Sequence, residues 1–253
     1  MPRLLQRSRD HGGVTAIVLG RMGSGKTTFL LSYLVRPLLE SGEKLYWRGG
    51  PFCQWGYLRV DQVKLLLSPD IEYRWFDRAK GGPIDLEDLG IEYSWIYDIQ
   101  DALWKADRGR LNILYVSDEG FRDFMEAANE RGDIDWISVF HDEIQKLAPS
   151  NVGGDQWLKN KRLADAIAET RKNYVSFYCA AQDFADVDYR VRRKMMYRVY
   201  LQDARPPRDS LVWRSVPRRL KPGEAIVEGS YFTKVKFEKL RRQLHVVVKL
   251  REV

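Results

Sequence analysis

Gly20-Arg21-Met22-Gly23-Ser24-Gly25-Lys26-Thr27 matches, without a mismatch, the pattern G-x-x-x-x-G-K-[S/T] of a phosphate-binding loop. Glycines allow the backbone of such a loop to curl so that its N–H groups point at phosphate oxygens. Lys26 is then expected to bridge the β- and γ-phosphates, and the Thr27 hydroxyl to bind Mg²⁺, a hard cation. Together with Thr28, this stretch predicts a site for a nucleoside triphosphate and Mg²⁺.

The sequence on either side of the loop has the pattern that such a loop requires. Residues 14–19 are a short apolar, β-branched run, typical of a buried parallel strand. Residues 28–39 repeat apolar side chains at helical spacing. A loop between a strand and a helix places the positive end of the helix dipole at the phosphates, so this context supports the motif.

A second acidic motif follows another apolar run. Residues 137–140 are expected to form a buried strand that leads into His141-Asp142-Glu143. An Asp at the carboxyl end of a parallel strand faces the ligand crevice, where Asp142 can hold Mg²⁺. Glu143 can then orient and deprotonate an attacking water, as in ATP hydrolysis. An isolated Asp-Glu pair more often caps the next element, but this pair follows an apolar run in a chain with a phosphate loop. His141 stands where an apolar residue is usually expected.

Strands and helices alternate along the chain, which predicts an α/β fold. The expected class is RecA-like: a P-loop fold with an added strand and a catalytic glutamate, a mostly parallel central sheet flanked by helices, and short C-terminal strands. The expected strands are 14–19, 44–47, 112–116, 137–140, 174–181, 196–201, 211–213, 225–227 and 245–250. The expected helices are 28–39, 60–67, 95–106, 119–130 and 156–172. The strand at 112–116, between the two motifs in sequence, is typical of this class.

The chain is expected to contain an ATPase domain at 1–205 and a basic, β-rich extension at 206–253, packed on the same domain. Residues 48–95 are irregular and rich in aromatic side chains, so we interpret them as an insertion. Their aromatic content motivates one further hypothesis, a docking surface for a capsid or portal protein.

Charge is distributed unevenly in this chain of 253 residues with a net charge of +7. Residues 190–253 carry 18 Lys and Arg against 6 Asp and Glu, whereas residues 1–189 carry 24 against 29. A basic segment beside an acidic body indicates a polyanionic partner or, equally, a solvated basic surface. No stretch approaches the ~20 apolar residues that cross a bilayer, so we expect no membrane span and a location in the cytoplasm of a host cell or in a virion. Two cysteines and three scattered histidines indicate neither a disulfide framework nor a zinc site.

The order of several short motifs resembles the core of HerA/FtsK-type ATPases. Asp142-Glu143 is followed by a short stretch to Pro149, and the next helix ends in Glu169-Thr170-Arg171-Lys172. The strand after it ends at Gln182, and a charged segment at 187–193 precedes the strand at 196–201. The resemblance covers 14–47 and 111–201. It implies that Gln182 senses the γ-phosphate or the attacking water, with Lys26 and Glu143 as the other catalytic residues.

Within this superfamily, the chain looks most like the compact genome-packaging ATPases of viruses. Cellular HerA proteins carry a domain before the phosphate loop and FtsK carries membrane helices, whereas Lys26 lies near the start of this sequence. Zonula-occludens-toxin-like phage assembly ATPases are the closest alternative, although they usually have a transmembrane segment. The resemblance implies ATP and Mg²⁺ as cofactors, double-stranded DNA as the partner, and a homo-oligomeric ring of five or six subunits.

A ring ATPase of this kind is expected to use an arginine from a neighbouring subunit and basic contacts to DNA. The candidate arginine fingers are Arg171, Arg190, Arg192 and Arg193, although for any single arginine a solvated or DNA-facing charge is the commoner role. The candidate DNA contacts are Lys159, Lys161, Arg162, Arg218, Arg219, Lys221, Arg241 and Arg242.

Two other functions fit part of the pattern. A small-molecule or nucleotide kinase would need an acceptor pocket, which residues 48–95 could provide, but Asp142-Glu143 and Gln182 argue against it. A scaffold protein with a degenerate nucleotide site is opposed by the intact Lys26 and Thr27. Phosphate release measured with and without DNA distinguishes the three.

Overall fold

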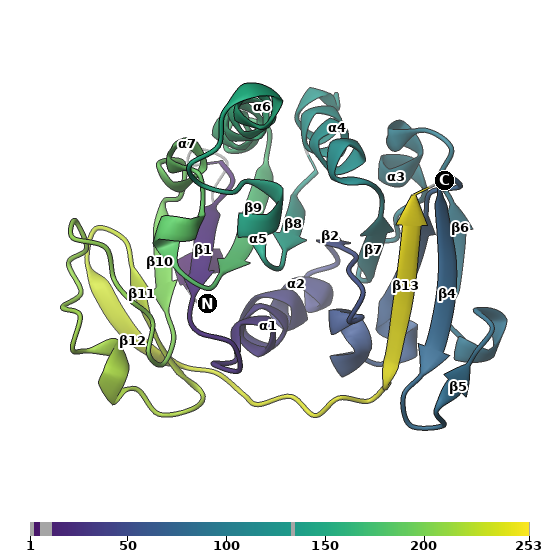
Figure 1. The fold of residues 1–253 in the computed structure, drawn as a ribbon, viewed down its shortest axis with the longest axis horizontal. Helices are drawn as coiled ribbons and strands as arrows, with labels where there is room; N and C mark the ends of the chain where they lie inside the picture. The colour runs from purple at the N-terminus through teal and green to yellow at the C-terminus, as the bar shows by residue number, and fades with distance from the viewer. Residues whose placement is uncertain (1–2, 6–11, 133–134, 253) are drawn as a thin grey trace.

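A computed structural model describes residues 3–5, 12–132 and 135–252, and its main feature is a ten-stranded sheet with the order β12-β11-β10-β1-β9-β8-β2-β7-β3-β6 (Figure 1). The eight strands from β10 to β6 run parallel, and β11 and β12 are antiparallel additions at one edge. The strands are β1 (Thr15–Leu19), β2 (Lys44–Arg48), β3 (Val63–Leu67), β6 (Glu92–Trp95), β7 (Leu111–Tyr115), β8 (Ile137–His141), β9 (Val175–Ala181), β10 (Tyr197–Tyr200), β11 (Glu224–Glu228) and β12 (Phe232–Lys236). This arrangement confirms the mostly parallel α/β fold.

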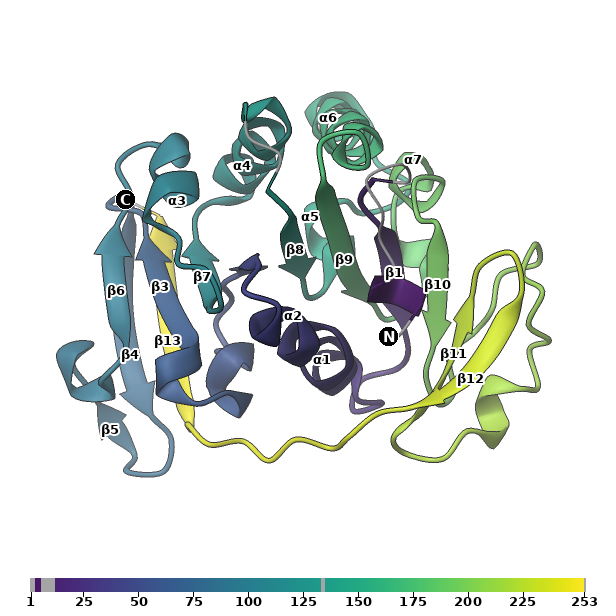
Figure 2. The same ribbon diagram turned by 180° about the vertical axis from the view of Figure 1, so that it is seen from behind.

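Helices cover both faces of the sheet, which explains why its central strands are apolar throughout (Figures 1 and 2). One face carries α3 (Ile99–Lys105), α4 (Asp118–Glu130), α5 (Ile144–Leu147), α6 (Gly154–Thr170) and α7 (Tyr189–Arg192). The other carries α1 (Lys26–Phe29), the π-helical segment η2 (Leu30–Val35) and α2 (Arg36–Glu40). Short 3₁₀ turns are η1 (Arg3–Leu5), η3 (Gln54–Tyr57), η4 (Val60–Gln62), η5 (Glu87–Leu89), η6 (Phe184–Asp186) and η7 (Pro217–Arg219). A separate apolar core therefore lies on each face of the sheet.

The strand order positions the two sequence motifs side by side. β9 lies between β1, which precedes the phosphate loop, and β8, which precedes Asp142. The carboxyl ends of these three parallel strands meet at one edge of the sheet, so the residues that follow them converge there. The strand expected at 112–116 forms as β7, but it lies outside β2, so the added strand between the motifs is β9.

Residues 48–95 are more regular than the sequence indicated. β3 and β6 extend the main sheet in parallel, whereas β4 (Ile71–Asp77) and β5 (Gly82–Pro83) form a second, antiparallel sheet with β13 (Val246–Glu252). The helix expected at 60–67 is wrong, because η4 gives way to β3 at Val63. All five residues of β3 are buried, Lys64 included, so its largely apolar run reflects a strand covered on both faces rather than a helix.

The C-terminal part of the chain spans the molecule. β11 and β12 lie at one end, and the segment after β12 passes beneath α1 to reach β13 at the other end, seen in yellow in Figure 1. β13 pairs with β4 over seven residues, from Val246 opposite Asp77 to Glu252 opposite Ile71. The strand expected at 211–213 is wrong: these residues form bends and Trp213 is 80% exposed. Within the described part of the chain, no helix is long and apolar enough to span a membrane.

Candidate nucleotide site

The phosphate loop joins β1 to α1 in a conformation that its glycines permit. Gly23 and Gly25 have φ values of 78° and 93°, in the left-handed region that residues with a Cβ rarely adopt. The Lys26 Nζ donates hydrogen bonds to the carbonyl oxygens of Gly20 (2.7 Å) and Arg21 (3.1 Å). The Lys26 ammonium therefore lies over the loop that is expected to hold the phosphates.

The two motifs meet through a direct hydrogen bond. Thr27 Oγ1 donates to Asp142 Oδ2 at 2.8 Å, across 115 positions of sequence. Burial raises the pKa of Asp142, while the Thr27 hydrogen bond and the charge of Lys26 lower it. Burial likewise lowers the pKa of Lys26, against the charges of Asp142 and Glu143. A hydroxyl and a carboxylate held together are hard oxygen donors, so these residues fit Mg²⁺ bound with a nucleotide.

Glu143 has an unusual backbone for a residue with a Cβ. Its φ of 61° and ψ of 49° place it in the left-handed region at the tight turn between β8 and α5. Such backbone strain gathers at functional sites. Its carboxylate accepts from Lys146 Nζ at 2.6 Å, an i,i+3 ion pair in which the Lys146 side chain is 68% exposed. This ion pair was not among the predicted contacts, although the Glu-x-x-Lys spacing at the start of a short helix was its signal.

One cavity of about 450 Å³ brings the predicted residues together. It is lined by Met22, Gly23, Gly25, Lys26, Thr27, Thr28, Asp142, Glu143 and Gln182. Gln182 follows β9 directly, so the strand between the two motifs supplies a polar side chain between their loops. The arrangement can hold phosphate groups, bind a divalent cation and place a carboxylate beside a water.

The cavity also has walls from residues that were not predicted to line it. Phe52, Gln54 and Tyr57 reach it from the segment after β2, and Arg242 from the segment before β13. The Arg242 guanidinium donates to the carbonyl oxygens of Phe52, Cys53 (3.1 Å), Leu244 (2.8 Å) and Val246 (3.0 Å), and lies 5.7 Å from the centre of the Tyr57 ring. Arg242 was predicted to contact DNA. In the structure its guanidinium holds one wall of the cavity in place through these backbone hydrogen bonds.

The candidate arginine fingers lie at the end of α6 and in and next to α7. Arg190 forms a two-pronged ion pair with Asp188, at 2.7 and 3.0 Å, and lies 4.3 Å from the Trp157 ring centre. Arg192 lies over Phe184 and Arg193 over Tyr189. Arg171 follows the end of α6. Among the described residues that line the cavity, none is one of these four.

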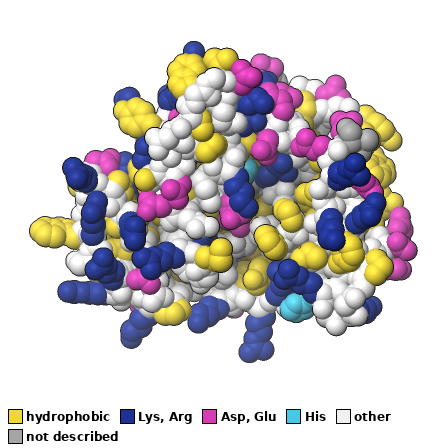
Figure 3. Space-filling view, viewed as in Figure 1, with side chains coloured by type: hydrophobic (Ala, Val, Ile, Leu, Met, Phe, Trp, Pro, Cys, Tyr) yellow, Lys and Arg dark blue, Asp and Glu magenta, His cyan; other side chains and the backbone are white. Residues whose placement is uncertain are grey.

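The candidate DNA contacts differ in how far their charges are balanced. Arg162 is paired with Glu119, Asp123 and Glu126 of α4. Lys159 and Lys161 are exposed on α6, Arg218 and Arg219 on η7, and Lys221 and Arg241 in the segments around β11 and β12. Figure 3 shows Lys and Arg side chains gathered along the lower and left part of the molecule, over the region of β11, β12 and the segment that follows.

No protein-family model and no curated protein matches the sequence. Solved structures with the same fold do match. The bacterial conjugative coupling protein TrwB aligns with a TM-score of 0.62 at 13% identity, over 93% of this chain and 87% of that one. The genome packaging NTPase B204 of Sulfolobus turreted icosahedral virus 2, solved with sulfate, aligns with a TM-score of 0.57 at 11% identity, over 91% and 99% of the two chains.

The same B204 protein solved with ATPγS aligns with a TM-score of 0.54 at 10% identity, over 93% of this chain and all of that one. This chain has a P-loop ATPase fold. The correspondence covers most of both chains.

Proposed function

We propose that this protein is an ATPase that translocates double-stranded DNA, and that it packages a viral genome. The observation that carries the proposal is the hydrogen bond between Thr27 and Asp142 in a cavity shared with Lys26, Glu143 and Gln182. This set supplies side chains for phosphate binding, cation binding, water activation and a polar sensor. The similarity to a viral genome packaging NTPase supports the choice of DNA as the partner.

Each residue has a defined part in the proposed hydrolysis. Lys26 and the loop amides would offset the charge of the β- and γ-phosphates, and Thr27 and Asp142 would hold Mg²⁺. Glu143 accepts a proton from the water that attacks the γ-phosphorus, and Gln182 holds that water or a γ-phosphate oxygen. Held by Thr27 and Asp142, Mg²⁺ would supply positive charge to offset the charge that develops on the departing diphosphate.

DNA would be held through its backbone rather than its sequence. The exposed Lys and Arg side chains on α6, η7 and the segments around β11 and β12 are suited to phosphate contacts. Arg162, which three carboxylates neutralise, contributes least to such a surface. A ring of five or six copies would surround the duplex, and among the candidate fingers Arg190 would have to leave its ion pair with the buried Asp188 to reach a neighbouring subunit.

Steady-state ATP hydrolysis with and without double-stranded DNA tests the proposal. We expect DNA to stimulate phosphate release several-fold. Glu143→Gln keeps the size and polarity of the side chain but cannot accept the proton, so we expect kcat to fall by about 10²–10⁴-fold. Lys80→Gln, a change of one exposed residue near β5, is the matched control and should hydrolyse ATP as the unmodified chain does. Brisk hydrolysis that ignores DNA would instead favour a protein-assembly ATPase or a kinase.

A further inference from the structure

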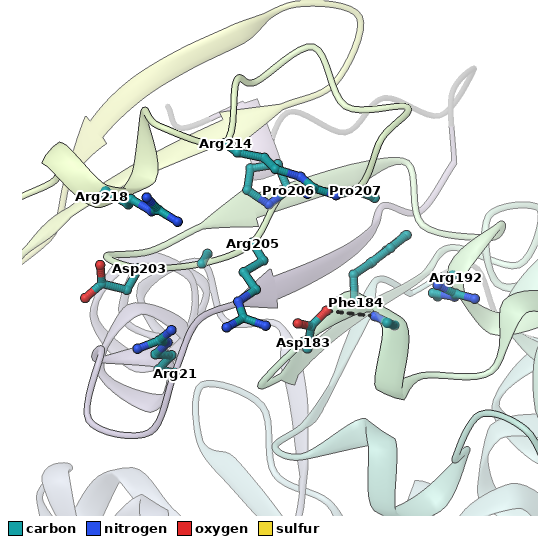
Figure 4. A pocket seen from close by; sticks show the side chains of 12 residues that line it. Arg21, Asp183, Phe184, Arg192, Asp203, Arg205, Pro206, Pro207, Arg214 and Arg218 are labelled. Carbon is teal, nitrogen blue, oxygen red and sulfur yellow. Dashed lines mark hydrogen bonds between the residues drawn. The ribbon is translucent and has the colours of Figure 1, made fainter.

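A second hollow, of about 470 Å³, lies beside the phosphate loop and is lined by five arginines (Figure 4). We call it the arginine pocket, and its arginines are Arg21, Arg192, Arg205, Arg214 and Arg218. They come from five separate places: the phosphate loop, α7, the segment after β10, the turn at Arg214 and η7. Figure 4 shows Arg21, Arg205 and Arg218 around the same space. A convergence of this kind is unlike a row of charges along one exposed helix face.

The positive charge of the arginine pocket is poorly balanced from within. Its two carboxylates belong to Asp183 and Asp203, and Asp183 accepts a hydrogen bond from the backbone N–H of Ala185. Over the described ranges, the guanidinium groups of Arg21, Arg205, Arg214 and Arg218 take part in no ion pair or hydrogen bond. Arg162 and Arg190, by contrast, are paired with carboxylates. Like charges held together repel one another, so an anionic ligand would relieve the repulsion.

The chemistry of the lining selects the kind of anion. A guanidinium presents a planar fork of N–H donors that matches two phosphate oxygens, and it remains charged throughout the physiological pH range. A volume of this size is within the range of small-ligand sites, and Pro206, Pro207 and Phe184 supply apolar walls for a sugar or a base. A phosphate-bearing nucleotide unit fits both the charge and the size.

Two loops each contribute one residue to the arginine pocket and the adjacent residue to the nucleotide cavity. In the phosphate loop, Arg21 lines the arginine pocket and the adjacent Met22 lines the nucleotide cavity. After β9, Gln182 lines the nucleotide cavity and the adjacent Asp183 lines the arginine pocket. A ligand on one side of either loop therefore acts on backbone that also shapes the other side, which provides a direct route for coupling the two sites.

We propose that the arginine pocket binds the phosphate group of a second nucleotide unit, distinct from the nucleotide held by the phosphate loop. Two sources offer this chemistry: a nucleotide of the DNA strand and a free nucleotide. The DNA source rests on the proposed function, whereas the free-nucleotide source does not.

The test compares two double variants. Arg205→Ala/Arg214→Ala removes two exposed, unpaired charges from the arginine pocket. Arg59→Ala/Arg74→Ala removes two exposed charges elsewhere, each beside its own carboxylate, Asp61 and Glu72. Binding of a short fluorescent DNA duplex is followed by anisotropy over a series of salt concentrations. Binding of ADP is followed by calorimetry in a Lys26→Ala background, which disables the phosphate loop.

For DNA, we expect the pocket variant to raise Kd by roughly tenfold and to lower the slope of log K against log salt by about two, because two phosphate contacts are lost. The control variant should change neither. If the source is a free nucleotide, residual ADP binding in the Lys26→Ala chain should vanish only in the pocket variant.

The outcomes separate the two proposals. If the unmodified chain binds DNA but both double variants bind it equally well, and residual ADP binding is absent or unaffected, the arginine pocket is not a phosphate site and the inference is overturned. If no chain binds DNA and DNA does not stimulate hydrolysis, the translocase proposal fails. ADP bound through the arginine pocket would still support the inference in that case.

Discussion

At the scale of single residues, the candidate site depends on a few polar contacts that sequence separation conceals. Thr27 and Asp142 are far apart in the chain, yet their side chains are 2.8 Å apart. Asp188 is a second example: it is buried and accepts hydrogen bonds from Arg190 and from Asn160 at 2.9 Å. Although burial raises it, these hydrogen bonds lower the pKa of Asp188 to about 2. The hydrogen bond between Asp188 and Asn160 fixes the start of α7 against α6.

This pKa predicts how the stability contributed by Asp188 varies with pH. Because the folded pKa lies below the unfolded value of about 3.9, the contribution is complete above pH 5 and is lost as pH falls towards 2. We expect Asp188→Asn to lower the free energy of unfolding by about 2 kcal/mol at pH 7 and by much less near pH 2.5. Urea unfolding at both values measures this. Asp186→Asn, an exposed neighbour, is the control, and an equal loss at both pH values would contradict the expectation.

At the scale of elements, one wall of the nucleotide cavity is formed by two segments that were predicted to lie outside the ATPase core. These are the insertion at 48–95 and the C-terminal extension at 206–253. Arg242 holds the loop of Phe52 and Tyr57 against the segment before β13 through bonds to four carbonyl oxygens. Phe237, from the same C-terminal segment, packs edge-on against Phe29 of α1, with ring centres 5.3 Å apart. A hypothetical Cβ on Gly25 would lie 3.5 Å from the Phe237 ring. The C-terminal segment therefore contacts α1 through Phe237 and one wall of the nucleotide cavity through Arg242.

Substitution of Arg242 distinguishes the effect of the planar guanidinium geometry from the effect of its positive charge. Arg242→Lys keeps the charge but lacks the planar fork, so we expect it to raise KM for ATP nearly as much as Arg242→Ala does. A rise of several-fold is expected for each, together with a loss of about 1–3 kcal/mol in the free energy of unfolding, since carbonyl oxygens lose their partner. Arg241, the exposed adjacent residue, provides the control: Arg241→Ala should leave KM unchanged. Full rescue by lysine would show that Arg242 acts through charge, as a DNA contact would.

The regular elements were predictable where their pattern was local. The buried strands β1, β7, β8 and β9 and the helices α4 and α6 follow from apolar runs and helical periodicity, and the two motifs located the edge at which the site lies. β3 was not predictable, because an apolar run buried on both faces looks the same in a strand and a helix. The roles of Tyr57 and Arg242 also escaped prediction, since they depend on pairing between β4 and β13, which no local pattern encodes.

At the scale of the whole molecule, the segment that leads from β12 to β13 connects one end of the main sheet to the second sheet at the other end (Figure 1). In β13, Val248 is 2% exposed, lies opposite Trp75 in β4 and donates its backbone N–H to the Pro51 carbonyl oxygen at 3.0 Å. The second sheet therefore depends on a strand that arrives from the far side of the molecule. The division of the chain at residue 205 stays a prediction, and a test of it has to account for this strand.

Val248→Asp tests how far the nucleotide cavity depends on β13. A buried, unpaired carboxylate is expected to lower the free energy of unfolding by about 3–5 kcal/mol and to raise KM for ATP, because Pro51 adjoins the loop that carries Phe52 and Tyr57. Val247→Asp introduces the same group at the neighbouring, partly exposed position and should cost much less. Urea unfolding and ATP titration provide the two readouts. Equal effects of the two substitutions would mean that β13 contributes little to the cavity.

The late position of β13 in the chain has a consequence for biosynthesis. The phosphate loop, the Asp142-Glu143 turn and Gln182 all leave the ribosome before the strand that anchors the Phe52–Tyr57 wall. A nascent chain can therefore assemble its catalytic side chains while β4 still has an open edge and Arg242 has not been made. We expect a chain that stops before Arg242 to keep these catalytic side chains but to lack the contacts that hold the Phe52–Tyr57 wall in place.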